Sequence, residues 1–279
     1  MATKLISIEA LYSFATVVEM ESFTRASKHI GRSQPAISMQ LKKLESQLEL
    51  ELFTRVNGAL ELTGPGRLLY EHAQQVLGLN DKVLQTLQGQ LLSGQLTFGM
   101  PSEFASQWLP KVLGRFTRAY PDVALDVSCA LSRDLQREDQ RKRYDLTLTL
   151  SRPATSELKD ELVWVGANRE PVAASSRLKL VAAPNGCIYR EAALSALQKA
   201  GQPALVSYTN ADFSGLLAAV QQGLGITVLA KSTVPEGLMI LEKGLPKLGD
   251  IGIHLNFGDT KKDAATKLAE YMREALQAL

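Results

Sequence analysis

The chain has 279 residues, of which 45% are hydrophobic and 22% are charged, and its formal net charge at pH 7 is +2. This composition is typical of a globular protein with a substantial core, and the length suits two or three domains. The near-neutral charge excludes a general polycation, so any nucleic-acid contact has to be local. The sequence contains no apolar run of about 18 residues and no secretion signal, so we expect a cytoplasmic protein without a membrane span.

Two short helical patterns meet at a tight connection within residues 23–51, after an apolar stripe over residues 8–20 that predicts a supporting helix. The connection contains Gly31, Ser33 and Pro35. Gly31 can adopt the positive φ that ends a helix, Ser33 can cap the next one, and Pro35 suits a first helical turn. This spacing predicts a helix-turn-helix, whose second helix enters the major groove in DNA-binding proteins.

The charges of this stretch favour DNA as the partner. Every ionisable charge between Glu21 and Glu45 is basic, as phosphate neutralisation requires. The second helix begins with small or amide-bearing side chains that can lie close to base edges. The alternative is a solvated face on two helices of an ordinary bundle. The candidate DNA-binding residues in this stretch are Arg25, Arg32, Ser33, Gln34, Pro35, Ser38, Gln40, Lys42 and Lys43.

A hairpin and then a long helix are predicted to follow. Asn57-Gly58 between two short apolar runs is the strongest local hairpin signal, and the hairpin makes the domain a winged helix. Residues 64–92 predict one helix whose apolar side chains repeat every seven residues, in a stripe too long for a small winged helix to cover. We therefore expect this helix to pair with its copy in a second subunit; folding back on its own chain is the alternative.

From residue 93 onward, strands alternate with helices, which predicts a mainly parallel sheet. Small molecules bind past the carboxyl ends of strands in such sheets, where helix N-termini offer free N–H groups. Polar residues follow four predicted strands, at 102–103, 132, 167–169 and 209–212. They indicate a ligand site, although helix capping is the ordinary role of such residues. A carboxylate at Glu103 would disfavour a simple anionic ligand.

Nothing in the sequence indicates catalysis. It lacks a nucleophile elbow, a P-loop, a zinc-protease motif and a dinucleotide fingerprint, and its three histidines have no companions at metal-ligand spacing. We therefore predict no enzyme, no resident cofactor and no metal. Cys129 and Cys187 are far apart and outside any CxxC motif, so two buried apolar thiols are expected, with a disulfide switch as the alternative.

The stretch from Phe14 to Arg55 resembles the N-terminus of the LysR-type transcriptional regulators. Its segments SFTRAS, SQPAIS and LELELFTR follow the family pattern SFTxAA, SQPAxS and LGxxLFxR, with departures at Ser27 and Glu49. The later stretch SGLLAAVQQGLGITVLA resembles the second lobe of the family's effector domain, with Ala230 where proline is usual. Residues 187–201 and 207–220 look like the branch that includes regulators of motility and virulence genes.

The resemblance implies a bacterial DNA-binding regulator with an all-α winged helix-turn-helix (1–63), a linker helix that forms the dimer interface (64–92), and an α/β, two-lobed, periplasmic-binding-protein-like effector domain (93–279). Lobe 1 would span about 93–160 and 260–279, and lobe 2 about 161–259. It further implies promoter DNA and RNA polymerase as partners, a homotetramer, a DNA contact from Arg55, and a small-molecule effector between the lobes. The candidate effector-binding residues are Ser102, Glu103, Ser132, Thr209 and Asn210.

Three other functions are weighed against this expectation. A small-molecule-binding or transport-type protein would not need the basic run, and an enzyme would need a catalytic set that the sequence does not supply. A DNA-binding regulator without a small-molecule response would differ only in its second half, so it remains the nearest alternative.

Overall fold

The computed structural model describes residues 5–56, 59–87, 92–167, 177–260 and 262–277. The predicted Asn57-Gly58 turn, the end of the linker helix at 88–91 and the candidate ligand residues 168–169 lie outside these ranges. The chain divides into two compact units, one of residues 1–93 with 113–122, and one of 94–112 with 123–277. Within the described residues, no helix is long and apolar enough to cross a membrane.

The first unit begins with the helix-turn-helix and its supporting helix. These are α1 (Ile8–Met20), α2 (Phe23–Ile30) and α3 (Gln34–Leu48). Each follows a serine whose hydroxyl accepts a hydrogen bond from an N–H of the first turn, which stabilises a helix by about 1 kcal/mol. Gly31 ends α2 at φ 73°, as predicted for the turn.

One apolar core joins the three helices to the segment that follows them. Phe14 and Ile37 are completely buried in it, and burial of such a side chain contributes roughly 1.5–3 kcal/mol. Because the core includes residues from α1, α2, α3, the wing and α4, it fixes the orientation of α3. Its buried members are Ala10, Leu11, Phe14, Val17, Met20, Ala26, Ile37, Leu41, Leu44, Leu52 and Ala73.

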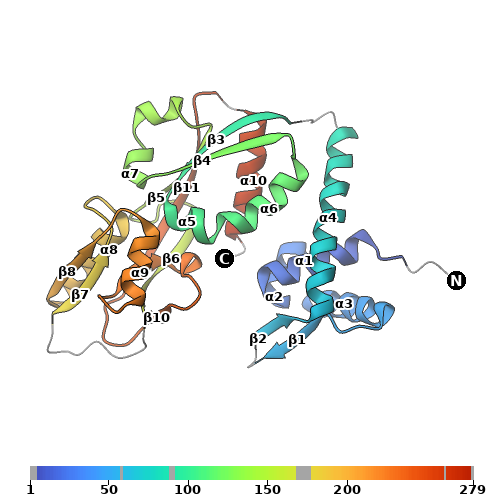
Figure 1. Ribbon diagram of the computed structural model, residues 1–279, viewed down its shortest axis with the longest axis horizontal. Helices are drawn as coiled ribbons and strands as arrows, with labels where there is room; N and C mark the ends of the chain where they lie inside the picture. The colour runs from blue at the N-terminus through green and yellow to red at the C-terminus, as the bar shows by residue number, and fades with distance from the viewer. Residues whose placement is uncertain (1–4, 57–58, 88–91, 168–176, 261, 278–279) are drawn as a thin grey trace. The chain divides into compact units, whose positions relative to one another are not determined.

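The wing and the linker helix complete this unit (Figure 1). Strands β1 (Phe53–Val56) and β2 (Ala59–Leu62) pair antiparallel, so the predicted hairpin is confirmed in its strands. Helix α4 (Gly64–Leu87) starts immediately afterwards. A Cβ on Gly66 would lie 2.1 Å from the Leu52 carbonyl oxygen, so only glycine allows the helix to start this close to the strand.

Helix α4 has two different apolar faces. Leu69, Tyr70, Ala73 and Leu77 pack against the winged-helix core. A second set of apolar side chains remains 42–80% exposed along the helix, and it comprises Leu68, Val76, Leu79, Val83, Leu84 and Leu87. Most of this exposed stripe belongs to the predicted seven-residue pattern, but Leu68 and Leu79 do not.

The second unit is built on a seven-stranded sheet with strand order β10-β6-β11-β5-β3-β4, in which β9 also pairs with β6. Strand β3 (Gly94–Met100) runs parallel to β4 (Val123–Cys129) and β5 (Leu146–Ser151). Strand β11 (Asp250–Phe257) is antiparallel to β5 and to β6 (Leu158–Gly166). The prediction of a mainly parallel sheet was therefore wrong for this sheet, in which only the pairings of β3 are parallel.

The second lobe contains shorter strands. Strand β6 pairs antiparallel with β9 (Thr227–Ala230) and β10 (Met239–Leu241), and the sequence pattern did not predict β10. Strands β7 (Leu178–Ala182) and β8 (Ala204–Thr209) pair in parallel. A core that includes Val165, Val181 and Val220 fills this lobe.

Helices connect these strands. Residues 102–119 form two helices that are separated at Trp108, and residues 132–142 form a single α-helical turn followed by a 3-10 segment (Glu138–Lys142). The helices are α5 (Ser102–Gln107), α6 (Leu109–Ala119), α7 (Ser132–Leu135), α8 (Ile188–Lys199), α9 (Phe213–Gln221) and α10 (Asp263–Gln277).

Two antiparallel strands connect the lobes of the second unit (Figure 1). Residues 158–161 of β6 pair with β11, whereas residues 162–165 pair with β9 and residues 164–166 pair with β10. Strand β11 in turn pairs with β6 at its start and with β5 along its length. Because the lobes share only these long strands as continuous elements, β6 and β11 are where a change in their relative arrangement would bend the chain.

Candidate DNA-reading surface and ligand cavity

Helix α3 turns one side into the core and leaves the other free. Ile37, Leu41 and Leu44 are buried, whereas Gln34 and Pro35 at its N-terminus are exposed. Ser38, in the next turn, is half-buried. Met39 is 70% exposed on the same helix. An exposed methionine here is a candidate for apolar contact with a thymine methyl group, and the site prediction did not include it.

The basic candidates differ in whether they form ion pairs within the protein. Arg25, Lys42, Lys43 and Arg55 are exposed, and none of them forms an ion pair with another described residue. Arg32 is ion-paired with Glu9 at the start of α1, with about half of each side chain exposed. Four unpaired cations on α2, α3 and the wing form a surface suited to phosphates.

Two polar candidates already have structural partners. Ser33 is the N-cap of α3, where its hydroxyl accepts a hydrogen bond from the Ala36 N–H at 3.4 Å. The Gln40 Oε1 atom accepts a 2.8 Å hydrogen bond from the Ser13 hydroxyl of α1. Gln40 therefore helps to orient α3 on its support, and its amide is less available to a base than that of Gln34.

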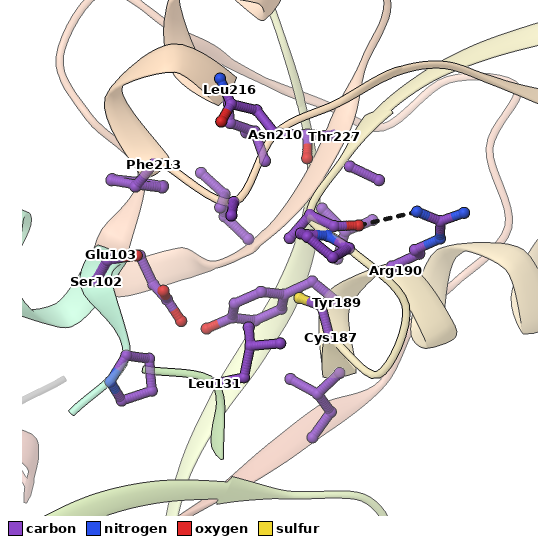
Figure 2. Close-up of a pocket in the computed structure, with 18 of the residues that line it drawn as sticks. Ser102, Glu103, Leu131, Cys187, Tyr189, Arg190, Asn210, Phe213, Leu216 and Thr227 are labelled. Atoms are coloured by element: carbon purple, nitrogen blue, oxygen red, sulfur yellow. Dashed lines mark hydrogen bonds between the residues drawn. The ribbon is translucent and has the colours of Figure 1, made fainter. Parts of the chain in front are cut away.

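The second unit contains a cavity of about 590 Å³ between its lobes. The first lobe contributes the turns after β3 and β4, and the second contributes the N-termini of α8 and α9 (Figure 2). Its size lies within the range of small-molecule pockets. Much of the lining is apolar, and it includes Leu131, Leu150, Leu180, Val181, Phe213 and Leu216.

Four of the five predicted effector residues line this cavity: Ser102, Glu103, Ser132 and Asn210. Thr209 does not line it, because it is exposed at the end of β8. Polar residues that follow strands were predicted to lie close together. The structure places four of them, from both lobes, around one cavity.

Some of these residues also support the local fold. The Ser132 hydroxyl accepts a 3.0 Å hydrogen bond from the Leu150 N–H, which ties α7 to β5. The Asn210 amide nitrogen donates to the Tyr208 hydroxyl at 3.0 Å, and its oxygen accepts from the Asp212 N–H at 2.9 Å. Their hydrogen-bonding capacity is thus partly used before any ligand arrives.

The polar ends of Glu103 and Tyr189 lie next to each other in the cavity (Figure 2). Glu103 is 7% exposed and Tyr189 is 8% exposed. Burial raises the pKa of the Glu103 carboxyl, and burial together with the nearby Glu103 charge raises the pKa of Tyr189 well above its usual value. The groups are close enough to influence each other's pKa, but the Tyr189 hydroxyl makes no hydrogen bond of normal geometry with a described residue.

Tyr189 was not among the predicted site residues, although a local signal was present. It lies in the first turn of α8, the helix that follows β7, and the predicted residues follow other strands in the same way. In the sequence, Tyr189 looks like an ordinary aromatic core residue. Its hydroxyl becomes a candidate ligand contact only because the fold brings Glu103 of the first lobe beside it.

Both cysteines are free, and both line the cavity. Cys187 is buried as predicted, but Cys129 is exposed, so the expectation of two buried thiols was wrong for one of them. Cys129 is the last residue of β4, where its side chain is exposed. Burial, and then the charge of Glu103, raise the pKa of the Cys129 thiol, which therefore resists ionisation.

A second, polar hollow of about 330 Å³ lies over β5 and β11. Within it the Ser151 Oγ and His254 Nε2 atoms are 2.8 Å apart. No aspartate or glutamate is among the described residues that line this hollow, so the pair lacks the carboxylate that orients a catalytic histidine.

The two units define a class of protein: a winged helix-turn-helix with an exposed recognition helix, and a two-lobed domain with a small-molecule cavity. Residues 8–67 match the bacterial regulatory helix-turn-helix domain of the lysR family, and residues 89–277 match the LysR substrate binding domain. The chain belongs to the LysR family of transcriptional regulators, which are DNA-binding proteins with an effector domain and not enzymes.

Relatives agree with this assignment along the chain. The transcriptional regulator DgdR of Burkholderia cepacia is 31% identical over 282 aligned positions, covering 98% of this chain and 96% of DgdR. PecT of Dickeya dadantii is 30% identical and covers 90% of this chain and 81% of PecT, which supports the predicted branch. The crystal structure of Vibrio fischeri DarR in complex with DNA covers 95% of this chain with a TM-score of 0.52 and 17% identity, and it supports the fold.

Proposed function

We propose that this protein binds promoter DNA as a two-fold dimer through α3 and the wing, and that a small molecule in the inter-lobe cavity changes that binding. The observation that carries the proposal is the coexistence of an exposed, unpaired basic surface on one unit and a 590 Å³ cavity in the other. A regulator without a small-molecule response would not need such a cavity.

On the DNA side, Gln34, Pro35 and Ser38 approach base edges from the N-terminal part of α3. Arg25, Lys42 and Lys43 contact phosphates on either side of the groove, and Arg55 contacts the backbone or the minor groove beside the wing. Arg32 and Ser33 contribute at the N-terminus of α3, where free N–H groups and a basic side chain favour a phosphate. Gln40 has the supporting role that its bond to α1 gives it.

Pairing of α4 supplies the two-fold symmetry. Its exposed apolar stripe has no cover within its own unit, and the same helix of a second chain can bury it. Two such dimers form a tetramer, and the DNA-bound assembly contacts RNA polymerase in the cytoplasm. The working division is a DNA-binding domain (1–63), a linker helix (64–92) and an effector domain (93–279).

The ligand acts by a shift in population between two arrangements of the lobes. Ser102, Glu103 and Ser132 belong to the first lobe and Asn210 to the second, so a molecule that contacts both favours one arrangement. Strands β6 and β11 join the lobes and absorb the change in angle. The assembly transmits this preference to the spacing of its DNA-binding pairs.

Two substitutions test the DNA contact. Gln34→Ala is expected to cost about 1–3 kcal/mol on the operator and to relax base preference there, whereas Lys42→Ala weakens all sequences and reduces the salt slope by about one. Fluorescence anisotropy with the operator fragment and a random duplex, over a range of salt concentrations, measures both. Lys243→Ala, at an exposed lysine of the second lobe, is the matched control. Equal losses on both duplexes for Gln34→Ala would place the recognition surface elsewhere.

Footprinting tests ligand control. The protein's own chromosome supplies the operator through genome-wide occupancy, beginning with the neighbouring divergent promoter. Footprint length and DNA bending are then measured with and without each small molecule that binds the protein. If the protein is controlled by a ligand, at least one of these molecules should change the footprint. If none of them does, the protein is a regulator without a small-molecule response.

A further inference from the structure

The cavity contains a buried acid without a basic partner. Glu103 is 7% exposed, and no lysine, arginine or histidine among the described residues forms an ion pair with it. Water alone compensates such a carboxylate poorly, because a buried charge is stable only when it is paired or hydrogen-bonded. The Glu103 backbone N–H and the Tyr189 hydroxyl stabilise the charged form in part, and a cationic ligand would supply the compensating charge.

The two arginines that line the cavity are directed elsewhere. The Arg190 guanidinium donates a 3.0 Å hydrogen bond to the Ala183 carbonyl, and Figure 2 shows its side chain extending away from Glu103. The Arg133 guanidinium is exposed and lies 3.5 Å from the Asp134 carboxylate. Neither cation lowers the pKa of Glu103; the groups that do so are its own backbone N–H and the Tyr189 hydroxyl, and both are neutral.

Tyr189 adds a second polar group. Its hydroxyl is buried and points toward the Glu103 carboxyl (Figure 2), close enough for each group to shift the pKa of the other, but it makes no hydrogen bond of normal geometry with a described residue. A carboxylate accepts hydrogen bonds, and a phenolic hydroxyl can accept one as well. The pair therefore offers acceptors to a group that carries several N–H donors and a positive charge.

We propose that the effector carries a protonated amino group, which forms an ion pair with Glu103 and donates a hydrogen bond to the Tyr189 hydroxyl. The rest of the molecule is a compact hydrocarbon group, because Leu131, Val181 and Phe213 line the adjoining wall. An anionic effector would instead bring a second negative charge beside Glu103. This inference rests on the proposed ligand control for its regulatory meaning, although binding of the amine can be measured without DNA.

Matched probes test the charge requirement on the full-length protein. The set consists of butylamine, cyclohexylamine and 2-phenylethylamine, each with the alcohol and the carboxylic acid of the same hydrocarbon group. Calorimetry at pH 7 measures affinity, and protection of Cys129 from iodoacetamide reports occupancy, because Cys129 is exposed and lines the cavity. We expect at least one amine to bind and to slow alkylation, while its alcohol and its acid do neither.

Two variants locate the amine. Glu103→Gln keeps the shape and removes the charge, so the amine should bind roughly 10- to 100-fold more weakly, as expected for a charge-assisted hydrogen bond. Tyr189→Phe should weaken it roughly 3- to 10-fold through loss of one neutral hydrogen bond. Glu236→Gln removes the same charge from an exposed position outside the cavity and should bind as the wild type does. Circular dichroism and the melting temperature confirm that each variant is folded.

The outcomes separate this inference from the proposed function. Binding of a carboxylate in place of every amine, binding of none of the amines, or equal amine affinity in Glu103→Gln would overturn the amine site. If a carboxylate binds and also changes the footprint, ligand control is supported and the proposed amine site is wrong. If an amine binds through Glu103 without changing the footprint, the amine site stands and ligand control is wrong.

Discussion

Dimerisation through α4 would bury side chains that are exposed in the single chain, and their exposed fractions set the size of the expected effect. Leu79 is 64% exposed and Val83 is 51% exposed, and they lie four residues apart on one stripe of the helix. At about 0.8 kcal/mol for each buried methylene-sized group, the exposed fractions correspond to about 1.5 kcal/mol for Leu79→Ala and about 0.8 kcal/mol for Val83→Ala in each protomer.

Two-fold symmetry doubles this loss, because each substitution is present on both helices of the pair. The double variant is therefore expected to lose about 5 kcal/mol of association free energy, which raises the dimer dissociation constant roughly 2,000- to 4,000-fold. Folding of the winged helix should be unaffected, since neither side chain belongs to its core.

Sedimentation equilibrium over a range of protein concentrations measures the dissociation constant directly. Leu205→Ala is the control, because Leu205 is 48% exposed but lies on β8, outside the first unit. A double variant that remains as associated as the wild type and the control would refute α4 as the dimer interface. Operator binding should fall together with dimerisation, because a single winged helix makes half of the contacts.

Other consequences can be checked with purified protein. Gly66→Ala should destabilise the winged-helix unit by about 1–3 kcal/mol through the clash with Leu52, whereas Gly64→Ala, in open space, should not; urea unfolding compares them. Because burial raises the pKa of Glu103 above 4.5, the folded state keeps a proton that the unfolded state releases, and stability falls as pH rises through that window. The melting temperature of Glu103→Gln should therefore exceed that of the wild type near neutral pH but not at pH 4. A difference in melting temperature that does not depend on pH would contradict ionisation of Glu103 as its cause. Gln40→Ala should cost about 1 kcal/mol of stability and weaken operator and random DNA equally, in contrast to a loss of specificity.

The N-terminal third could be predicted from local signals. Ser33, Pro35 and Gly31 act within one or two turns of themselves, so their effect on the backbone depends little on distant residues. The same holds for the strands of the wing, where the alternation of apolar residues and the turn signal determine the register. Family resemblance in this stretch follows from the same local constraints.

Features that depend on distant parts of the chain were predicted less well. Strands β6 and β11 read as ordinary strands, but their antiparallel pairing joins segments about 90 residues apart, which no local pattern encodes. The break between α5 and α6 at Trp108 is an exception, because it has a local signal: Pro110 lacks a backbone N–H and disfavours a helix that continues through the residues before it. Gln40 looked like a base-contacting amide, and only the position of α1 shows that Ser13 engages it.

The sequence by itself determined that the chain contains a DNA-reading helix, a wing, a long apolar linker helix and an α/β remainder. It also placed Glu103 after a strand, because capping positions and strand ends are local properties. Only the tertiary structure decided that Tyr189, 86 positions later in the numbering, lies next to that acid in a shared cavity. The physical reason is that burial and the absence of a charged partner are properties of three-dimensional surroundings, to which both lobes contribute.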